Sequence, residues 1–131
     1  MTTPKILIVD DEAETRKTLS DYLFSRIQCA ILQASNGYEA IEQLKSQPID
    51  LILLDITMPG ISGTEVIQKA REIRKDAEII VITKWDSTDV SKQVKESGAD
   101  YIPKPFSLKV VRAKIEEKLQ AMGKFTGKQV G

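Results

Sequence analysis

Residues 50–55 read DLILLD, an apolar run of strand length that ends in an aspartate. Three further runs share this design, at 5–9 (KILIV), 78–82 (EIIVI) and 100–102 (DYI), and each reaches a polar or charged residue within two positions. The central runs are apolar without alternation, which is typical of strands in a parallel sheet with helices on both faces. Because the carboxyl ends of parallel strands lie along one edge, we expect the residues that follow these runs to meet there.

Helical patterns separate the strand-like runs. Asp11, Asn36 and Ser62 each stand three positions before a glutamate, as helix-capping residues do, and Asp86 and Ser107 are suitable caps for two later helices. Strands are predicted near 5–10, 29–34, 50–55, 78–83 and 100–102. The alternation of strands and helices predicts repeated βαβ units, and therefore an α/β fold.

The fourth predicted helix, at about 86–97, differs from the others. Its apolar residues are Val90 and Val94, so that it buries little surface. One interpretation is a well-solvated surface helix. The other is an element that shifts, because segments of low stability are the ones recruited for switching.

The composition is that of one globular domain, with 131 residues, of which 41% are hydrophobic and 29% charged. The 19 basic and 19 acidic residues cancel, so the charge favours neither nucleic acid nor an anionic membrane surface. With one cysteine, Cys29, and no recognisable secretory signal, we expect a cytoplasmic chain. We expect the domain at 1–122, and a flexible tail or the start of a linker at 123–131.

The chain has no histidine. This excludes a histidine general base, a serine–histidine triad and a histidine zinc site within the chain. The chain also cannot act as a histidine phosphodonor, so any phosphoryl group must come from another molecule.

The residues at the predicted strand ends suit phosphoryl chemistry. Asp10, Asp11 and Asp55 would crowd three carboxylates together, which favours a hard cation such as Mg2+ among them. Asp55 follows the most apolar strand and could act as a nucleophile toward phosphorus. Thr83 offers a hydroxyl donor and Lys104 a flexible positive charge to a phosphoryl group.

Each of these residues also has an ordinary explanation. Asp11 could be a helix cap, Asp55 the first residue of a loop, Thr83 a strand residue and Lys104 a solvated surface lysine. The argument for a site depends on the set, because all of them stand at strand ends, in order, in a repeated α/β pattern.

Four segments carry a resemblance to a known family: 9–12 (VDDE), 53–63 (LLDITMPGISG), 80–83 (IVIT) and 98–106 (GADYIPKPF). In these segments the chain resembles the receiver domain of bacterial two-component response regulators, and the resemblance covers residues 4–122. It implies a flavodoxin-like, doubly wound sheet of five parallel strands in the order 2-1-3-4-5. Five helices would complete three layers, α/β/α.

The resemblance also implies roles for the site residues. Asp55 would accept a phosphoryl group from the phosphohistidine of a sensor histidine kinase, or from a phosphotransfer protein. Asp11, Asp55 and the backbone carbonyl of Thr57 would bind Mg2+ directly, and Asp10 through a water. Thr83 and Lys104 would bind the phosphoryl oxygens.

A switch follows from the same resemblance. Tyr101 would turn inward as Thr83 moves toward the phosphate, although an ordinary sheet-edge aromatic is its alternative interpretation. The bond before Pro105 is expected to be cis. The fourth helix, fifth strand and fifth helix would then control a partner, an output domain or a second copy of the chain, with no direct contact to nucleic acid or membrane. Enzymatic activity would be limited to self-phosphorylation from small donors and self-dephosphorylation.

Lys84 departs from the family pattern, in which the residue after the threonine is usually small, and Trp85 follows it. A long cation beside the phosphoryl site could add a contact or crowd out water and partners. We hypothesise that Lys84 alters, and more specifically slows, the phosphorylation chemistry. The measurement is the rate of phosphorylation and dephosphorylation of Lys84→Ala, and unchanged rates would refute the hypothesis. Thr57, at a position that tunes hydrolysis in the family, is a milder departure.

Three alternatives stay open at the level of sequence. A Mg2+-dependent aspartyl-nucleophile phosphatase is disfavoured by Thr57, which stands where such enzymes carry a second aspartate, and by the lack of a cap insertion. A flavodoxin-like electron carrier is disfavoured because the acidic loop after the first strand would repel a flavin phosphate. A degenerate receiver that acts only as a protein-interaction module is compatible with Lys84.

Overall fold

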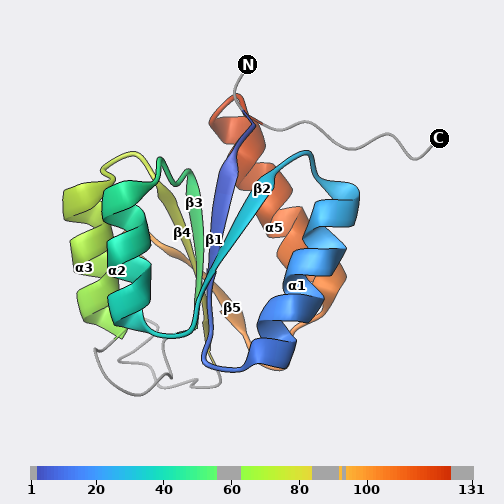
Figure 1. The fold of residues 1–131 in the computed structure, drawn as a ribbon, viewed down its shortest axis with the longest axis horizontal. Coiled ribbons are helices and arrows are strands. Elements are labelled where there is room, and N and C mark those ends of the chain that lie inside the picture. Colours follow the sequence, from blue (N-terminus) through green and yellow to red (C-terminus); the bar gives the residue numbers. More distant parts are fainter. Residues whose placement is uncertain (1–2, 56–62, 84–91, 93, 125–131) are drawn as a thin grey trace.

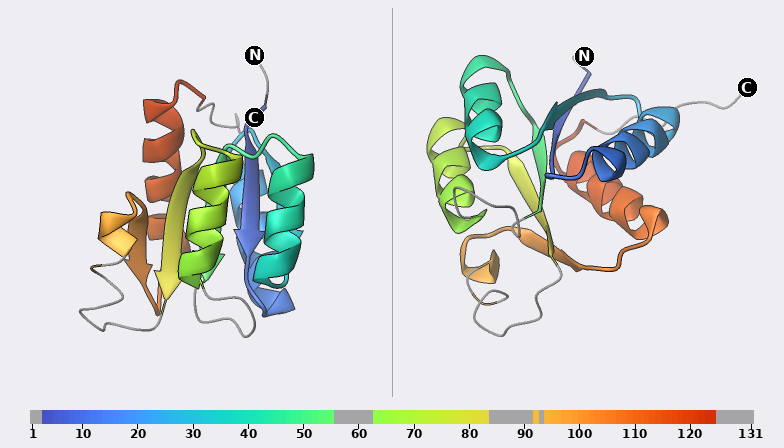
Figure 2. Two further views of the ribbon diagram at one scale, coloured as in Figure 1. Left: turned by 90° about the vertical axis from the view of Figure 1, so that its left-hand side faces the viewer. Right: turned by 60° about the horizontal axis from the view of Figure 1, so that its bottom comes forward.

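In the computed structural model of the chain, a single parallel sheet forms the centre of the molecule. The structure describes residues 3–55, 63–83, 92 and 94–124. The sheet has five strands in the order β2-β1-β3-β4-β5, as predicted, and the strand arrows run in one direction (Figure 2). The strands are β1 (Lys5–Val9), β2 (Ala30–Ala34), β3 (Leu51–Asp55), β4 (Glu78–Thr83) and β5 (Asp100–Pro103).

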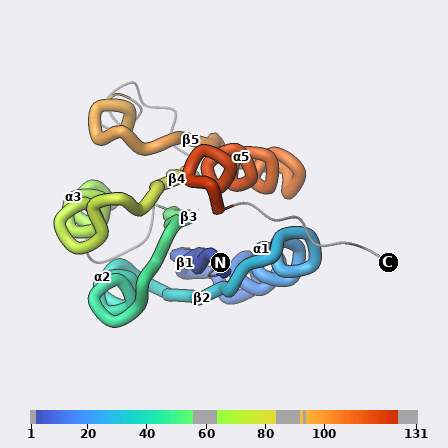
Figure 3. Tube along the Cα trace, turned by 90° about the horizontal axis from the view of Figure 1, so that it is seen from above, coloured from blue at the N-terminus to red at the C-terminus, as the bar shows by residue number. Residues whose placement is uncertain are grey.

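Helices cover both faces of this sheet. On one face lie α1 (Ala13–Arg26) and α5 (Leu108–Ala121), and on the other α2 (Gly37–Ser46) and α3 (Gly63–Ile73) (Figures 1 and 3). Residues 92 and 94–96 are helical, and the remainder of the fourth predicted helix lies outside the described residues. No helix in the described part of the chain is both long and apolar enough to cross a membrane.

The core consists of two clusters separated by the sheet. Successive strand residues point to opposite faces, so Leu53 packs in the cluster beneath α1 and α5, and Leu54 in the cluster beneath α2 and α3. Both faces are covered, and this explains why β3 is buried along its whole length and shows no polar alternation. The sheet is therefore a rigid base for the residues at its ends.

Two of the predicted helix starts are confirmed. The side chain of Asn36 accepts a hydrogen bond from the N–H of Glu39 at 2.9 Å, and that of Ser107 accepts one from Val110 at 3.1 Å. The predicted caps Ser62 and Asp86 lie outside the described residues.

The prediction that Asp11 caps the first helix is wrong. The N-cap position of α1 is Glu12, and no side chain caps it. The N–H of Glu12 is instead bonded to Oδ1 of Asp10 at 2.8 Å, within the turn that leads into the helix. Helix capping therefore does not account for the carboxylate of Asp11.

Candidate functional site

The polar residues predicted to gather at the sheet do lie at one edge of it. Asp10 follows the last residue of β1, Asp55 ends β3, Thr83 ends β4 and Lys104 follows β5. These residues share one edge because all the strands are parallel, and the carboxyl ends of parallel strands lie on the same side of the sheet.

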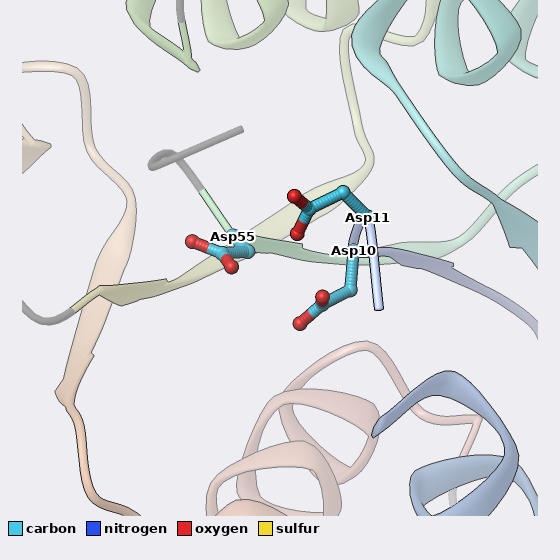
Figure 4. A group of neighbouring side chains, drawn as sticks. All are labelled: Asp10, Asp11 and Asp55. Atoms are coloured by element: carbon cyan, nitrogen blue, oxygen red, sulfur yellow. The ribbon is translucent and has the colours of Figure 1, made fainter. Parts of the chain in front are cut away.

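Three carboxylates form a compact cluster at this edge. Asp10, Asp11 and Asp55 each offer an oxygen that lies within 4.8 Å of the other two (Figure 4). Asp10 and Asp55 are buried, each with 4% of its surface exposed, whereas Asp11 is exposed to solvent. Two of the charges are thus shielded from water, and the third lies at the mouth of the site.

Lys104 partly neutralises this cluster. Its Nζ lies 2.8 Å from Oδ2 of Asp55 and 3.9 Å from Oδ2 of Asp10. Burial by itself would lower the pKa of Lys104, but the hydrogen bond to Asp55 and the charges of both aspartates outweigh it and raise that pKa. The lysine is therefore held in its charged form. The bond between Lys104 and Pro105 is cis, as predicted.

The negative charge of Asp10 is only partly compensated by its neighbours. Burial raises its pKa, a hydrogen bond from the N–H of Glu12 opposes this, and the negative charge of Asp55 raises it further. The ammonium group of Lys104 pairs with Asp10 and Asp55, and the third carboxylate of the cluster, that of Asp11, lies close to both of them, so these four residues together carry an excess of negative charge. The donors are all carboxylate oxygens, which suit a hard cation such as Mg2+. The residues present therefore fit the metal that the sequence suggests.

Thr83 and Tyr101 lie on the two strands beyond Asp55. Thr83 is fully buried at the end of β4 and pairs with Pro103, and its carbonyl accepts a hydrogen bond from the N–H of Lys104 at 2.9 Å. Tyr101 is half-buried on β5 and packs against the core cluster beneath α2 and α3. The other residues singled out by sequence, Thr57, Lys84 and Trp85, lie outside the described residues.

Sequence reasoning missed one residue at the site, Arg16. Its Nη1 donates a hydrogen bond to the backbone carbonyl of Asp10 at 2.6 Å. A signal for it exists in the sequence, because Arg16 stands in the first turn of α1, where the helix dipole disfavours a positive charge. A cation placed there needs another partner to compensate, and the structure supplies one.

Comparison with known proteins identifies relatives over nearly the whole chain. The family model described as response regulator receiver domain matches residues 6–116. The transcriptional regulatory protein ResD of Bacillus subtilis is 44% identical over 117 residues, which cover 88% of this chain and 48% of that protein. Sporulation initiation phosphotransferase F of the same organism is 32% identical over 120 residues, which cover 91% of this chain and 96% of that protein.

The fold has close counterparts among solved structures. The crystal structure of a response regulator receiver domain protein (CheY-like) from Methanospirillum hungatei JF-1 aligns with a TM-score of 0.87 and 30% identity, covering 94% of this chain and 98% of that one. The chain spans half or less of the length of several curated relatives that it matches. These comparisons therefore describe this domain, and not the longer proteins in which similar domains occur.

Proposed function

The chain belongs to the response regulator receiver domain family, and from this premise we propose that it is a phosphorylation-controlled switch with Asp55 as the phosphoacceptor. Receiver domains take part in two-component, phosphorylation-based signalling and are regulatory proteins. The observation that carries the proposal is the buried carboxylate of Asp55 within an acidic cluster and in contact with Lys104.

The proposed acceptor is suited to nucleophilic attack. A carboxylate oxygen of Asp55 forms the new bond to phosphorus while the bond between phosphorus and its donor breaks. Lys104 already contacts this carboxylate at 2.8 Å, so its ammonium group is in position to pair with a phosphoryl oxygen after transfer. We assign the hydroxyl of Thr83, on the neighbouring strand, to a second phosphoryl oxygen.

Mg2+ is the proposed cofactor. Asp11 and Asp55 would bind it directly, together with the backbone carbonyl of Thr57, and Asp10 through a water. The Thr57 contribution rests on the resemblance alone, because that residue lies outside the described part of the chain. When bound, the ion supplies positive charge that reduces the repulsion between the carboxylates and an incoming phosphoryl group.

The readout of the switch is proposed to be the surface formed by the fourth helix, β5 and α5. Phosphorylation adds negative charge and strong acceptors beside Thr83 and Lys104. These two residues would contact phosphoryl oxygens only in the phosphorylated state. Such differential binding shifts an existing equilibrium between two conformations. Tyr101 lies on β5, two residues before Pro103, the strand partner of Thr83, and is our candidate for the aromatic residue that reports the shift.

The partners follow from the family. Receiver domains interact with histidine kinases and phosphotransfer proteins, and several relatives of this chain are longer proteins. We propose a cytoplasmic domain that ends near residue 122, with the following residues as a tail or linker to an output domain. Its own catalysis would be confined to acquiring and losing the phosphoryl group on Asp55.

Metal dependence tests the proposed function directly. We expect the chain to gain the mass of one phosphoryl group when incubated with acetyl phosphate and Mg2+, and none when EDTA replaces Mg2+, because the acidic cluster would repel an anionic donor. Intact-mass spectrometry makes the measurement. A chain that binds Mg2+ but gains no mass from acetyl phosphate or from a phosphorylated histidine protein would support the degenerate, interaction-only alternative.

A further inference from the structure

Arg16 connects the acidic cluster to the second strand. Its guanidinium group donates from Nη1 to the backbone carbonyl of Asp10 at 2.6 Å and from Nε to Oε1 of Gln33 at 3.2 Å. Arg16 lies on α1 and Gln33 on β2, so the two residues approach the turn after β1 from neighbouring elements. The side chain of Arg16 is half-buried and is fixed at two points.

The carbonyl of Asp10 that Arg16 contacts lies in the peptide that joins Asp10 to Asp11. The carbonyl group of Asp10 and the N–H of Asp11 belong to the same planar peptide unit. A bond that fixes this carbonyl therefore also fixes the direction in which the chain leaves Asp10, and with it the Cα of Asp11. One hydrogen bond thus constrains the main chain of both aspartates.

Two other bonds of this turn act on the peptides on either side of the one that Arg16 contacts. The N–H of Asp10 donates to the carbonyl of Ala34 at 3.1 Å, and Oδ1 of Asp10 accepts from the N–H of Glu12 at 2.8 Å. Asp11 is exposed and does not cap the helix, so neither burial nor capping holds its position. The guanidinium of Arg16 contacts the peptide between the two carboxylates directly.

We propose that Arg16, oriented by Gln33, is a positioning residue that holds Asp10 and Asp11 in the arrangement in which they bind Mg2+. This inference rests on the proposed function, because it assumes that the cluster binds that ion. Groups that hold metal ligands in place typically contribute about 10-fold to 100-fold in metal affinity.

The charge of Arg16 makes the inference easy to distinguish from a simple electrostatic effect. A positive charge near a cation site opposes binding, so removing it should strengthen Mg2+ binding if charge were its whole effect. Loss of positioning should instead weaken binding. The two explanations predict changes of opposite sign.

The test is calorimetric titration of the intact chain with MgCl2, without a phosphodonor. We expect Arg16→Met to weaken Mg2+ binding about 10-fold, and Arg16→Lys to recover it only in part, because lysine lacks the planar pair of donors. Gln33→Ala, which changes no atom of Arg16 or Asp10, should weaken binding by about 3-fold, less than the range for groups that hold a ligand directly, because Gln33 acts through Arg16.

Lys17→Met is the matched control. Lys17 is the next residue on α1, is exposed and pairs with Asp21 at 2.8 Å, so its loss removes the same charge without touching the turn. Its Mg2+ affinity should equal or slightly exceed that of the unmodified chain. Urea unfolding of each variant without Mg2+ establishes that the protein titrated is folded, since a purely structural role would lower the unfolding midpoint and leave the affinity of the folded chain unchanged.

Equal or tighter Mg2+ binding by folded Arg16→Met would overturn the inference and leave the proposed function intact. An equal loss in Lys17→Met would overturn it as well, because the loss would then not depend on the contacts that Arg16 makes with the turn. If the unmodified chain bound no Mg2+, both the proposed function and this inference would fail.

Discussion

Replacement of Asp55 by asparagine is expected to abolish phosphorylation of the chain by acetyl phosphate in the presence of Mg2+. An amide lacks the anionic oxygen that attacks phosphorus, so no aspartyl phosphate can form at this position. Asparagine has nearly the same shape and keeps one oxygen as an acceptor for Lys104, which contacts Asp55 at 2.8 Å. The fold should therefore survive, and intact-mass spectrometry should show the loss of the adduct.

Asp50→Asn provides a matched control, because Asp50 immediately precedes the same strand and lies at the opposite edge of the sheet. Its carboxylate accepts a hydrogen bond from the backbone N–H of Lys5 at 2.9 Å and pairs with Lys124. The Asp50→Asn chain should be phosphorylated as fully as the unmodified one. An adduct of undiminished amount in Asp55→Asn would place the phosphoacceptor on another residue and contradict the proposed function.

The positions of the strands along the chain could be predicted because burial on both faces requires apolar residues, whereas their order in the sheet was implied by the resemblance to receiver domains. Leu53 and Leu54 face opposite layers of helices, so both must be apolar, and the run at 50–55 shows no polar alternation. Parallel strands then bring Asp10, Asp55 and Lys104 to one edge without any knowledge of side-chain geometry. The gathering of these residues is therefore a consequence of topology.

The details of the first turn could not be predicted in the same way. The spacing of Asp11 and Glu14 suggested a cap at Asp11, but local spacing does not reveal that the side chain of Asp10 bonds to the N–H of Glu12. The contact between Arg16 and Gln33 joins a helix to a strand 17 positions away, and it depends on the register of β2 beside β1. Contacts of this kind are set by tertiary packing and leave no short motif.

Replacement of Asp10 by asparagine is expected to stabilise the metal-free chain, raising its free energy of unfolding at pH 7. Asp10 is buried beside another carboxylate, and burial raises its pKa, so folding disfavours its charged form. Asparagine removes the charge and keeps the oxygen that accepts the N–H of Glu12. Urea unfolding in the presence of EDTA makes the measurement.

The pH dependence of this effect has a definite sign. Because the pKa of Asp10 is higher in the folded than in the unfolded chain, the native state binds the proton more tightly, and the unmodified chain gains stability as pH falls through the folded pKa. Asp10→Asn lacks this gain, so its advantage should be complete above the folded pKa and should vanish below the ordinary value of 3.8.

Mg2+, like protons, should reduce the difference in free energy of unfolding between the unmodified chain and Asp10→Asn. A ligand that binds the folded state stabilises it by mass action, and the unmodified chain, with its full set of carboxylates, should gain more from Mg2+ than Asp10→Asn. The advantage of the variant should therefore shrink as Mg2+ is added at pH 7. A variant less stable than the unmodified chain in EDTA would contradict this prediction. It would show that Lys104 and the hydrogen bond from Glu12 already compensate the charge of Asp10, so that this charge does not lower the free energy of unfolding.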